Sequence, residues 1–271
     1  MIKLPSNVDI NNLIDDLRIF SWEASDILLH ISNQIQDVNY KKNIIKYKGN
    51  DDPVTLADLQ VNEHIIKRIN EKYKNVDWTI LSEENINYES DANLGKNWVW
   101  VFDPLDGTKD FIQGTGNYAM HLALNYKNKP LLGVVLIPAR NELWISNGKD
   151  VWCEGRDGDR DDNYSVNKGN LNEMTLVKSR NHSNKILNAL INKIHFKNII
   201  EMGSIGCKIA SILRGESDIY LSFSHKEIGA PKDWDFAAPE VILTTFGGAI
   251  TNLRNESLKY NKKNFDQDGL I

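Results

Sequence analysis

Short apolar segments of strand length follow one another through the middle of the chain, and turn-forming residues separate them. The expected strands are Trp78–Leu81, Trp98–Phe102, Ala119–Tyr126, Leu131–Ile137, Leu143–Ile145 and Val151–Cys153. The sequences Asn128-Lys129-Pro130 and Asn147-Gly148 are typical of turns between adjacent strands. This region therefore predicts an antiparallel meander, and the chain lacks the heptads or repeats of a coiled coil or solenoid.

Helical periodicity precedes the meander. Apolar residues recur at helical spacing from Ile10 to Ile35, which predicts one long amphipathic helix. A second helix is expected from near Thr55 to Tyr73, with Asp58 in or just before its first turn.

Strands and helices alternate after a polar, turn-rich stretch over 155–170. The expected strands are Thr175–Ser179, Asn198–Met202 and Ile219–Ser222, and the expected helices are Asn184–Lys193, Ser204–Leu213 and Phe236–Phe246. The order predicts an α+β N-terminal lobe over residues 1–165 and an α/β C-terminal lobe over residues 166–271. Together they form a layered α/β fold.

Composition excludes several classes of protein. In 271 residues, 41% are hydrophobic and 25% are charged, which excludes wholesale disorder. The net charge of −5 excludes a generally basic binder of nucleic acid polymers. We expect no signal peptide and no membrane span, because no apolar run is long enough. The only cysteines, Cys153 and Cys207, form no metal or disulfide motif, which predicts a cytoplasmic protein.

Carboxylates recur where expected strands stop and helices begin. They are Asp58, Glu83, Glu84, Asp103, Asp106 and Asp235. Strand ends and helix starts are where active sites form in layered α/β proteins. If these acids converge, their mutual repulsion requires cations, and all-oxygen ligand sets favour Mg²⁺.

The densest of these signals is Asp103-Pro104-Leu105-Asp106-Gly107-Thr108. Gly107 allows close approach of the backbone to a ligand, and the amides of Gly107 and Thr108 could hold a phosphate oxygen. The alternative is an ordinary Asx-rich turn that caps a helix. His121, between Met120 and Leu122, is expected to be a core or sheet-face histidine and not a ligand.

Four segments resemble, in order, the motifs of the lithium-sensitive, magnesium-dependent phosphatases. They are Asp52–Asp58, Ser82–Glu84, Asp103–Thr108 and Trp234–Pro239. That superfamily includes inositol monophosphatases, fructose-1,6-bisphosphatases and 3′(2′),5′-bisphosphate nucleotidases. The resemblance covers nearly the whole chain and implies a sugar-phosphatase-type fold and sensitivity to lithium. Relatives generally continue beyond the position that matches Ile271.

The resemblance also implies roles for individual residues. The implied metal ligands, for two or three Mg²⁺ ions, are Glu83, Asp103, the carbonyl of Leu105, Asp106 and Asp235. Asp58 and Thr108, with Glu83, are implied to position and activate the attacking water, without a covalent intermediate.

Within the superfamily, three segments are similar to bisphosphate nucleotidases: Lys109-Asp110-Phe111, Ser179-Arg180-Asn181-His182, and Gly203-Ser204 followed by Lys208. His182 is expected near the nucleoside, and Ser204 with Lys208 is expected to seat a second phosphate. Gly107, Thr108 and Asp235 are the other expected substrate contacts. The alternative for Lys208 is a solvated surface lysine.

The expected substrate is therefore a small phosphorylated nucleotide, 3′-phosphoadenosine 5′-phosphate, which is the by-product of sulfate transfer. An inositol-phosphate or other small sugar-phosphate phosphatase is the first alternative. The second is a catalytically silent relative that binds nucleotide or metal. All the expected acids and Thr108 are present, which argues against the silent relative.

Overall fold

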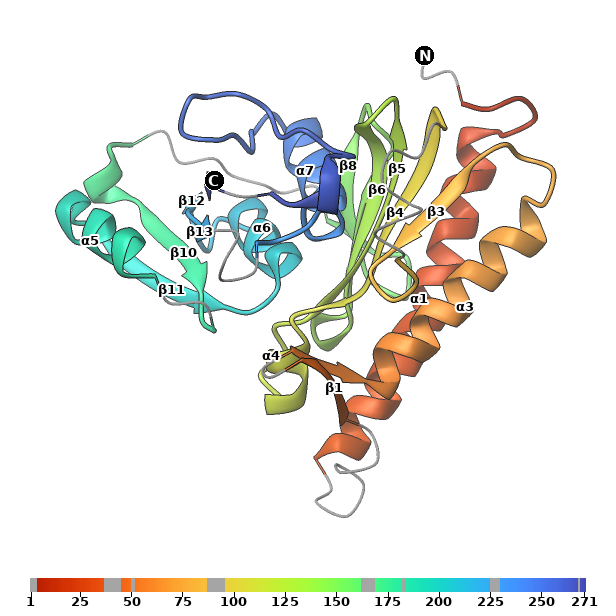
Figure 1. The fold of residues 1–271 in the computed structure, drawn as a ribbon, viewed down its shortest axis with the longest axis horizontal. Coiled ribbons are helices and arrows are strands. Elements are labelled where there is room, and N and C mark those ends of the chain that lie inside the picture. The colour runs from red at the N-terminus through yellow and green to blue at the C-terminus, as the bar shows by residue number, and fades with distance from the viewer. Residues whose placement is uncertain are drawn as a thin grey trace.

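The computed structural model describes residues 4–36, 45–49, 52–86, 96–161, 169–181, 184–224, 230–267 and 269–271. Figure 1 shows its helices and sheets stacked in layers. The layers are, in order, helices α1 and α3, a seven-stranded sheet, helices α6 and α7, a three-stranded sheet, and helix α5. This arrangement confirms the layered α/β fold that the sequence predicts.

The large sheet has the strand order β3-β4-β5-β6-β7-β8-β9. Its strands are β3 (Thr79–Ser82), β4 (Trp98–Asp106), β5 (Ala119–Tyr126), β6 (Lys129–Ile137), β7 (Glu142–Ser146), β8 (Val151–Glu154) and β9 (Arg160–Asp161). β3 is parallel to β4, and every later neighbour is antiparallel. The predicted meander is present, with one parallel strand added at its edge.

A β-bulge near the end of β4 decides which side chains share a face of the sheet. Between Asp103 and Asp106, three steps along β4 match two steps along β5. Residues three apart point to opposite faces of a regular strand, and one extra residue brings them back to the same face. The apolar neighbours follow this rule, since Phe102 and Leu105 both belong to the core beneath α1 and α3. Asp103 and Asp106 consequently share the face that α6 and α7 cover.

Two amphipathic helices, α1 (Ile10–Ile35) and α3 (Leu56–Lys72), cover the first face of the sheet. The Asp9 side chain accepts hydrogen bonds from the N–H groups of Asn11 and Asn12, which satisfies donors that the first turn of α1 leaves free. The apolar faces of both helices are buried in one core with the sheet. This packing, more than local propensity, stabilises the helices.

Helices α6 (Ile205–Leu213) and α7 (Asp233–Phe246) cover the second face. Ala119 and Ala123 of β5 and Ala237 and Ala238 of α7 are fully buried there, and these small side chains permit close approach. The C-terminal third therefore shares a core with the large sheet. The expected lobe boundary between residues 165 and 166 lies outside the described residues, and the division into two lobes stays a prediction.

The small sheet is parallel, with β10 (Thr175–Ser179) between β11 (Asn198–Met202) and β12 (Ile219–Tyr220). Helix α5 (Lys185–Ile194) packs against it through Leu187 and Ile191. The last strand is shorter than the predicted Ile219–Ser222. Helix α7 begins three residues before the predicted start at Phe236, because the Asp235 side chain caps its first turn.

Several short elements complete the described chain. They are β1 (Ile45–Gly49), β2 (Asp52–Thr55), α4 (Thr108–Gln113), β13 (Phe223–Ser224), β14 (Gly269–Leu270), and the 3₁₀ helices η1 (Pro138–Arg140), η2 (Leu171–Glu173) and η4 (Lys263–Phe265). The β1–β2 and β13–β14 pairs are antiparallel and were not predicted. Among the described helices, none has the length and apolar character needed to cross a bilayer.

Candidate active site

Three carboxylates meet at the bulged end of β4. Asp103, Asp106 and Asp235 each place one carboxylate oxygen within 4.8 Å of the others, and we call these three residues the acid cluster. Glu83 follows β3, and its backbone N–H donates to the carbonyl of Phe102, the residue before Asp103, at 3.2 Å. The parallel pairing of β3 with β4 therefore brings Glu83 beside the cluster.

The acid cluster carries strong electrostatic repulsion. Asp103 is 1% exposed, and its pKa is raised well above the ordinary value, first by burial and then by Glu83, Asp106 and Asp235. Burial and the Asp106 charge raise the pKa of Asp235 to about 7. Bound cations offset the cost of burying the carboxylate charges and the repulsion between them, and carboxylate and carbonyl oxygens suit Mg²⁺. The residues present therefore fit a hard divalent cation.

The start of α6 holds one oxygen of Asp106. The Ser204 hydroxyl donates to Asp106 Oδ2 at 2.6 Å, and the backbone N–H groups of Ile205 and Gly206 donate to the same atom at 2.5 and 3.4 Å. A helix N-terminus stabilises a carboxylate through these donors and its dipole. The other oxygen, Oδ1, is consequently the one left for a cation.

Asp235 and Leu105 are held by local hydrogen bonds. The Lys232 N–H donates to Asp235 Oδ2 at 2.5 Å, which places Asp235 in the first turn of α7. The Thr108 hydroxyl donates to the Leu105 carbonyl at 3.2 Å. A carbonyl oxygen has two lone pairs, so this contact leaves one for a metal.

Asp58 lies on the other side of Thr108. The N–H and the hydroxyl of Thr55 each donate to Asp58 Oδ2 at 2.7 Å, which forms a capping box at the start of α3. The Thr108 hydroxyl lies 3.4 Å from Asp58 Oδ1. Burial raises the pKa of Asp58 to about 7 although the Thr55 hydrogen bonds oppose this, and Glu84 raises it further. An acid with such a pKa can exchange protons near neutral pH.

Gly107 has φ of +89°, a conformation that favours glycine. A Cβ there would lie 2.9 Å from the Asn117 carbonyl oxygen and 3.1 Å from the Ser204 N atom. The loop after Asp106 therefore packs directly on the start of α6.

The structure places Ser204 and Lys208 differently from the sequence-based expectation. Ser204 has no exposed surface and Lys208 is 2% exposed, so the surface-lysine alternative is wrong. Lys208 Nζ donates to the Gly203 carbonyl and lies 5.4 Å from the centre of the Tyr220 ring. The helix start holds the Asp106 carboxylate where a phosphate was expected. A direct phosphate contact for either residue stays a prediction.

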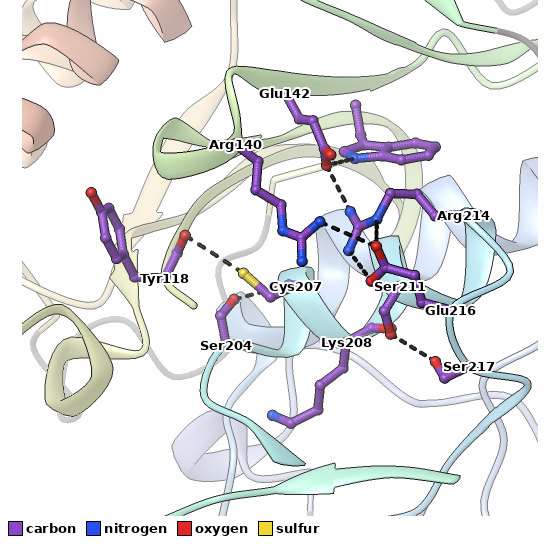
Figure 2. Close-up of polar contacts among 11 residues, drawn as sticks. Tyr118, Arg140, Glu142, Ser204, Cys207, Lys208, Ser211, Arg214, Glu216 and Ser217 are labelled. Atoms are coloured by element: carbon purple, nitrogen blue, oxygen red, sulfur yellow. Dashed lines mark hydrogen bonds and ion pairs between the residues drawn. The ribbon is translucent and has the colours of Figure 1, made fainter. Parts of the chain in front are cut away.

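Figure 2 shows how the two ends of α6 are tied down. At the start, Ser204 Oγ accepts from the Cys207 N–H at 3.2 Å. At the end, Arg214 contacts Glu142 at 2.7 Å and Glu216 at 2.9 Å, and Arg140 contacts Glu216 at 3.1 Å. These ion pairs join α6 to the turn between β6 and β7.

Asp110, two residues after Thr108, is fully buried. It accepts hydrogen bonds from Arg180 at 2.6 Å, Asn181 at 2.6 Å and Thr115 at 2.7 Å. The segment after β10 therefore reaches the neighbourhood of Thr108. His182 itself lies outside the described residues.

Two residues near the site were not predicted to belong to it. Thr55 holds Asp58, and the spacing Thr55-x-x-Asp58 is a sequence signal for a capping box. His121 is completely buried on a face of the sheet, as expected, but its Nε2 atom lies 3.3 Å from Asp106 Oδ2. No local pattern indicates this contact, because it depends on the pairing of β4 with β5.

A layered α/β fold with an acid cluster at the end of a bulged strand is suited to a metal-dependent enzyme. The chain belongs to the inositol monophosphatase family, whose sequence profile matches residues 19–268. It is thus a metal-dependent phosphoric monoester hydrolase, as its motifs predict.

Curated relatives and solved structures agree with this assignment. The 3′(2′),5′-bisphosphate nucleotidase CysQ of Buchnera aphidicola is 28% identical over 258 residues, which covers 93% of this chain and 90% of the relative. The CysQ of Haemophilus influenzae is 28% identical over 83% of this chain and 81% of the relative. The fold is shared with CysQ from Bacteroides thetaiotaomicron, which has a TM-score of 0.74 and 24% identity over 94% of this chain and 95% of that one. An IMPase from Thermotoga maritima has a TM-score of 0.74 and 20% identity over 94% and 90%.

Proposed function

We propose that the chain hydrolyses its phosphomonoester by direct attack of water, with two or three Mg²⁺ ions held by the acid cluster, Glu83 and the Leu105 carbonyl. The observation that carries this proposal is the approach of three carboxylate oxygens to within 4.8 Å of one another. When bound, such cations lower the pKa of water and neutralise charge on the phosphate.

Asp58, Thr108 and Glu83 are the proposed catalytic residues. Thr55 already donates twice to Oδ2 of Asp58, so Oδ1, which lies 3.4 Å from the Thr108 hydroxyl, is the oxygen that would accept a proton. In the metal-free protein, burial raises the pKa of Asp58 to about 7, so this carboxyl group can bind and release a proton near neutral pH. Thr108 would orient the water between Asp58 and the phosphate.

The substrate we favour is 3′-phosphoadenosine 5′-phosphate. Support comes from the curated relatives named as bisphosphate nucleotidases and from the segment after β10, where Arg180 and Asn181 hold Asp110 close to Thr108. Gly107, Thr108 and Asp235 remain the proposed contacts of the reacting phosphate. His182 remains the proposed neighbour of the nucleoside.

An inositol-phosphate or other small sugar-phosphate phosphatase is the second candidate. The observation in its favour is the burial of Ser204 and Lys208, the expected seat of a second phosphate. A Staphylococcus aureus enzyme with this fold, 23% identical, is described as bound to inositol monophosphate, and a 21% identical structure of it as bound to 2′AMP.

A phosphate-release assay with Mg²⁺ separates these candidates. It compares 3′-phosphoadenosine 5′-phosphate, adenosine 5′-phosphate and inositol 1-phosphate, and we expect the highest kcat/KM for the bisphosphate. A higher value for inositol 1-phosphate would favour the second candidate. Release from none of the three would favour the catalytically silent relative.

Lys208→Met tests whether Lys208 contacts a second phosphate, a contact that its burial argues against. Because Lys208 is buried and bonded to Gly203, we expect the variant to lose kcat/KM equally for the bisphosphate and a monophosphate. A loss of tenfold or more confined to the bisphosphate, about 1.4 kcal/mol, would return Lys208 to the substrate site.

We also infer a cytoplasmic location and a small phosphorylated partner. The chain has only two cysteines, Cys153 and Cys207, and both are buried, which supports a reducing compartment. The net charge of −5 argues against binding a nucleic acid polymer. Cell fractionation with an antibody against the chain would test the location, and recovery outside the cytoplasm would contradict it.

A further inference from the structure

His121 lies beside two of the elements that carry the acid cluster. In the β4–β5 ladder it pairs directly with Asp103, on the face covered by α6 and α7. The ring is fully buried, and Nε2 lies 3.3 Å from Asp106 Oδ2. Among the described residues, neither ring nitrogen has a hydrogen-bond partner of good geometry. Buried polar atoms without partners are rare, and each calls for an explanation.

Helices α6 and α7 also enclose the ring. A Cβ added at Gly206 would lie 2.3 Å from Nε2, so α6 approaches closely only because this residue is glycine. Burial lowers the pKa of His121, and the Asp106 charge and the nearby peptide groups of Trp234 and Asp235 oppose this effect. Pro239 has no N–H, which leaves the Asp235 carbonyl without its usual partner in α7.

The protonation of Nε2 follows from what surrounds Asp106 Oδ2. That oxygen accepts from Ser204, Ile205 and Gly206, and an ionised carboxylate can only accept hydrogen bonds. A ring nitrogen that presents a lone pair to this oxygen would be repelled. The favourable tautomer therefore carries its proton on Nε2.

We propose that His121 is a positioning residue for Asp106: its Nε2–H, 3.3 Å from Oδ2 and beside the first turn of α6, helps to restrain this oxygen, so that Oδ1 is presented to the catalytic cation. The inference rests on the proposed role of Asp106 as a metal ligand. Partners of this kind orient metal-binding groups and commonly change metal affinity by about 10- to 100-fold when they are removed. The ordinary alternative is a histidine that only fills space between the sheet and α6.

A matched pair of substitutions separates the two roles. His121→Gln keeps an N–H donor at about the reach of Nε2, whereas His121→Asn places its amide near the position of Nδ1. His121→Leu keeps comparable volume without a donor. His64→Gln is the control, because His64 also contacts a carboxylate, Glu23 at 2.9 Å, but joins α3 to α1 away from the acid cluster.

The readout is Mn²⁺ binding to the substrate-free protein, followed by electron paramagnetic resonance, with thermal unfolding of the metal-free variants as a check on folding. We expect His121→Asn and His121→Leu to bind Mn²⁺ about tenfold or more weakly, and His121→Gln to stay within about threefold of the wild type. The control should bind as the wild type does.

Two results would overturn the inference. Equal affinity in folded Asn or Leu variants would assign His121 to packing alone. Equal loss in the Gln and Asn variants would show that the donor position is irrelevant. If the wild-type protein binds no Mn²⁺, the proposed metal site itself fails, which the wild-type titration alone reveals.

Discussion

At the residue scale, three acids of the site are held in the same way. Asp58, Asp106 and Asp235 each use one carboxylate oxygen to accept from a backbone N–H at the start of a helix, namely α3, α6 and α7. The donors at a helix start are unsatisfied within the helix and favour negative charge. Each carboxylate is thereby fixed by one oxygen and leaves the other for a cation or a proton.

Asp103 gives the sharpest test among the proposed ligands, because it is the most buried of the cluster and is flanked by Glu83, Asp106 and Asp235. We expect Asp103→Asn to reduce kcat/KM by about 10³-fold or more, equivalent to about 4 kcal/mol, because the cation that stabilises the transition state is lost or displaced. Asp150→Asn, at an exposed turn, is the control. Steady-state phosphate release at saturating Mg²⁺ measures both, and near-normal turnover in Asp103→Asn would exclude it as a ligand.

Thr55 should tune the proposed general base. Its hydroxyl stabilises the ionised form of Asp58, so Thr55→Val should raise the pKa of Asp58. If Asp58 must be ionised, the acidic limb of the kcat/KM profile moves to higher pH. Thr55→Ser keeps the hydroxyl and should keep the wild-type profile. If the acidic limb of the Thr55→Val profile is not shifted, Asp58 is not the general base.

At the element scale, the contact between α6 and β5 sets the position of the site. Gly206→Ala would bring a Cβ to 2.3 Å from His121 Nε2 and 2.7 Å from Val135 Cγ1. We expect it to lower the free energy of unfolding by about 1–3 kcal/mol through overpacking. Adding His121→Ala should recover part of this loss. Urea unfolding of the wild type, the two single variants and the double variant measures the coupling energy between the two positions. If the two changes in unfolding free energy simply add, the clash does not involve His121.

Most elements could be predicted from the sequence because their periodicity is local. The helical spacing of α1 and the short apolar runs of β5 to β8 each fit within one segment. The β4 bulge could not be predicted, since it is defined by pairing with another strand and changes which residues share a face. The contact of α6 and α7 with the large sheet is likewise non-local, which is why a separate C-terminal lobe was expected.

The same limit applies to the site. The acids and the Thr55–Asp58 capping box can be predicted from residue types and their spacing in the sequence. Lys208 was expected at the surface or on a phosphate, but it is buried. His121 was expected to be an ordinary core or sheet-face residue, but the pairing of β4 with β5 places it beside the acid cluster. A helix start that can bind a phosphate binds a carboxylate equally well, so sequence alone could not choose between them.

At the scale of the whole molecule, several buried acids make the metal-free fold sensitive to pH. Burial raises the pKa of Asp58, Asp235 and Glu240 to about 7 and that of Asp233 to about 6. Each group binds its proton more tightly when folded than when unfolded, where its pKa is near 4. Between about pH 4 and 7 the folded state therefore holds more protons, and stability falls as pH rises.

Urea unfolding at pH 5.5 and 7.5, with and without Mg²⁺, tests this linkage. Without Mg²⁺ we expect greater stability at pH 5.5, by up to about 1.4 kcal/mol per pH unit for each titrating group. With Mg²⁺ the difference should shrink, because a cation favours the ionised Asp235 and its neighbours. A metal-free protein that is more stable at pH 7.5 would contradict the account.

The central claim is that Asp103, Asp106 and Asp235 together hold the catalytic cation. The most direct measurement is the anomalous difference map of crystals grown with MnCl₂, recorded above the manganese absorption edge. The account predicts a peak coordinated by oxygens of all three carboxylates, and no such peak in Asp103→Asn crystals prepared identically. Manganese bound elsewhere, with these carboxylates unligated at saturating metal, would contradict it.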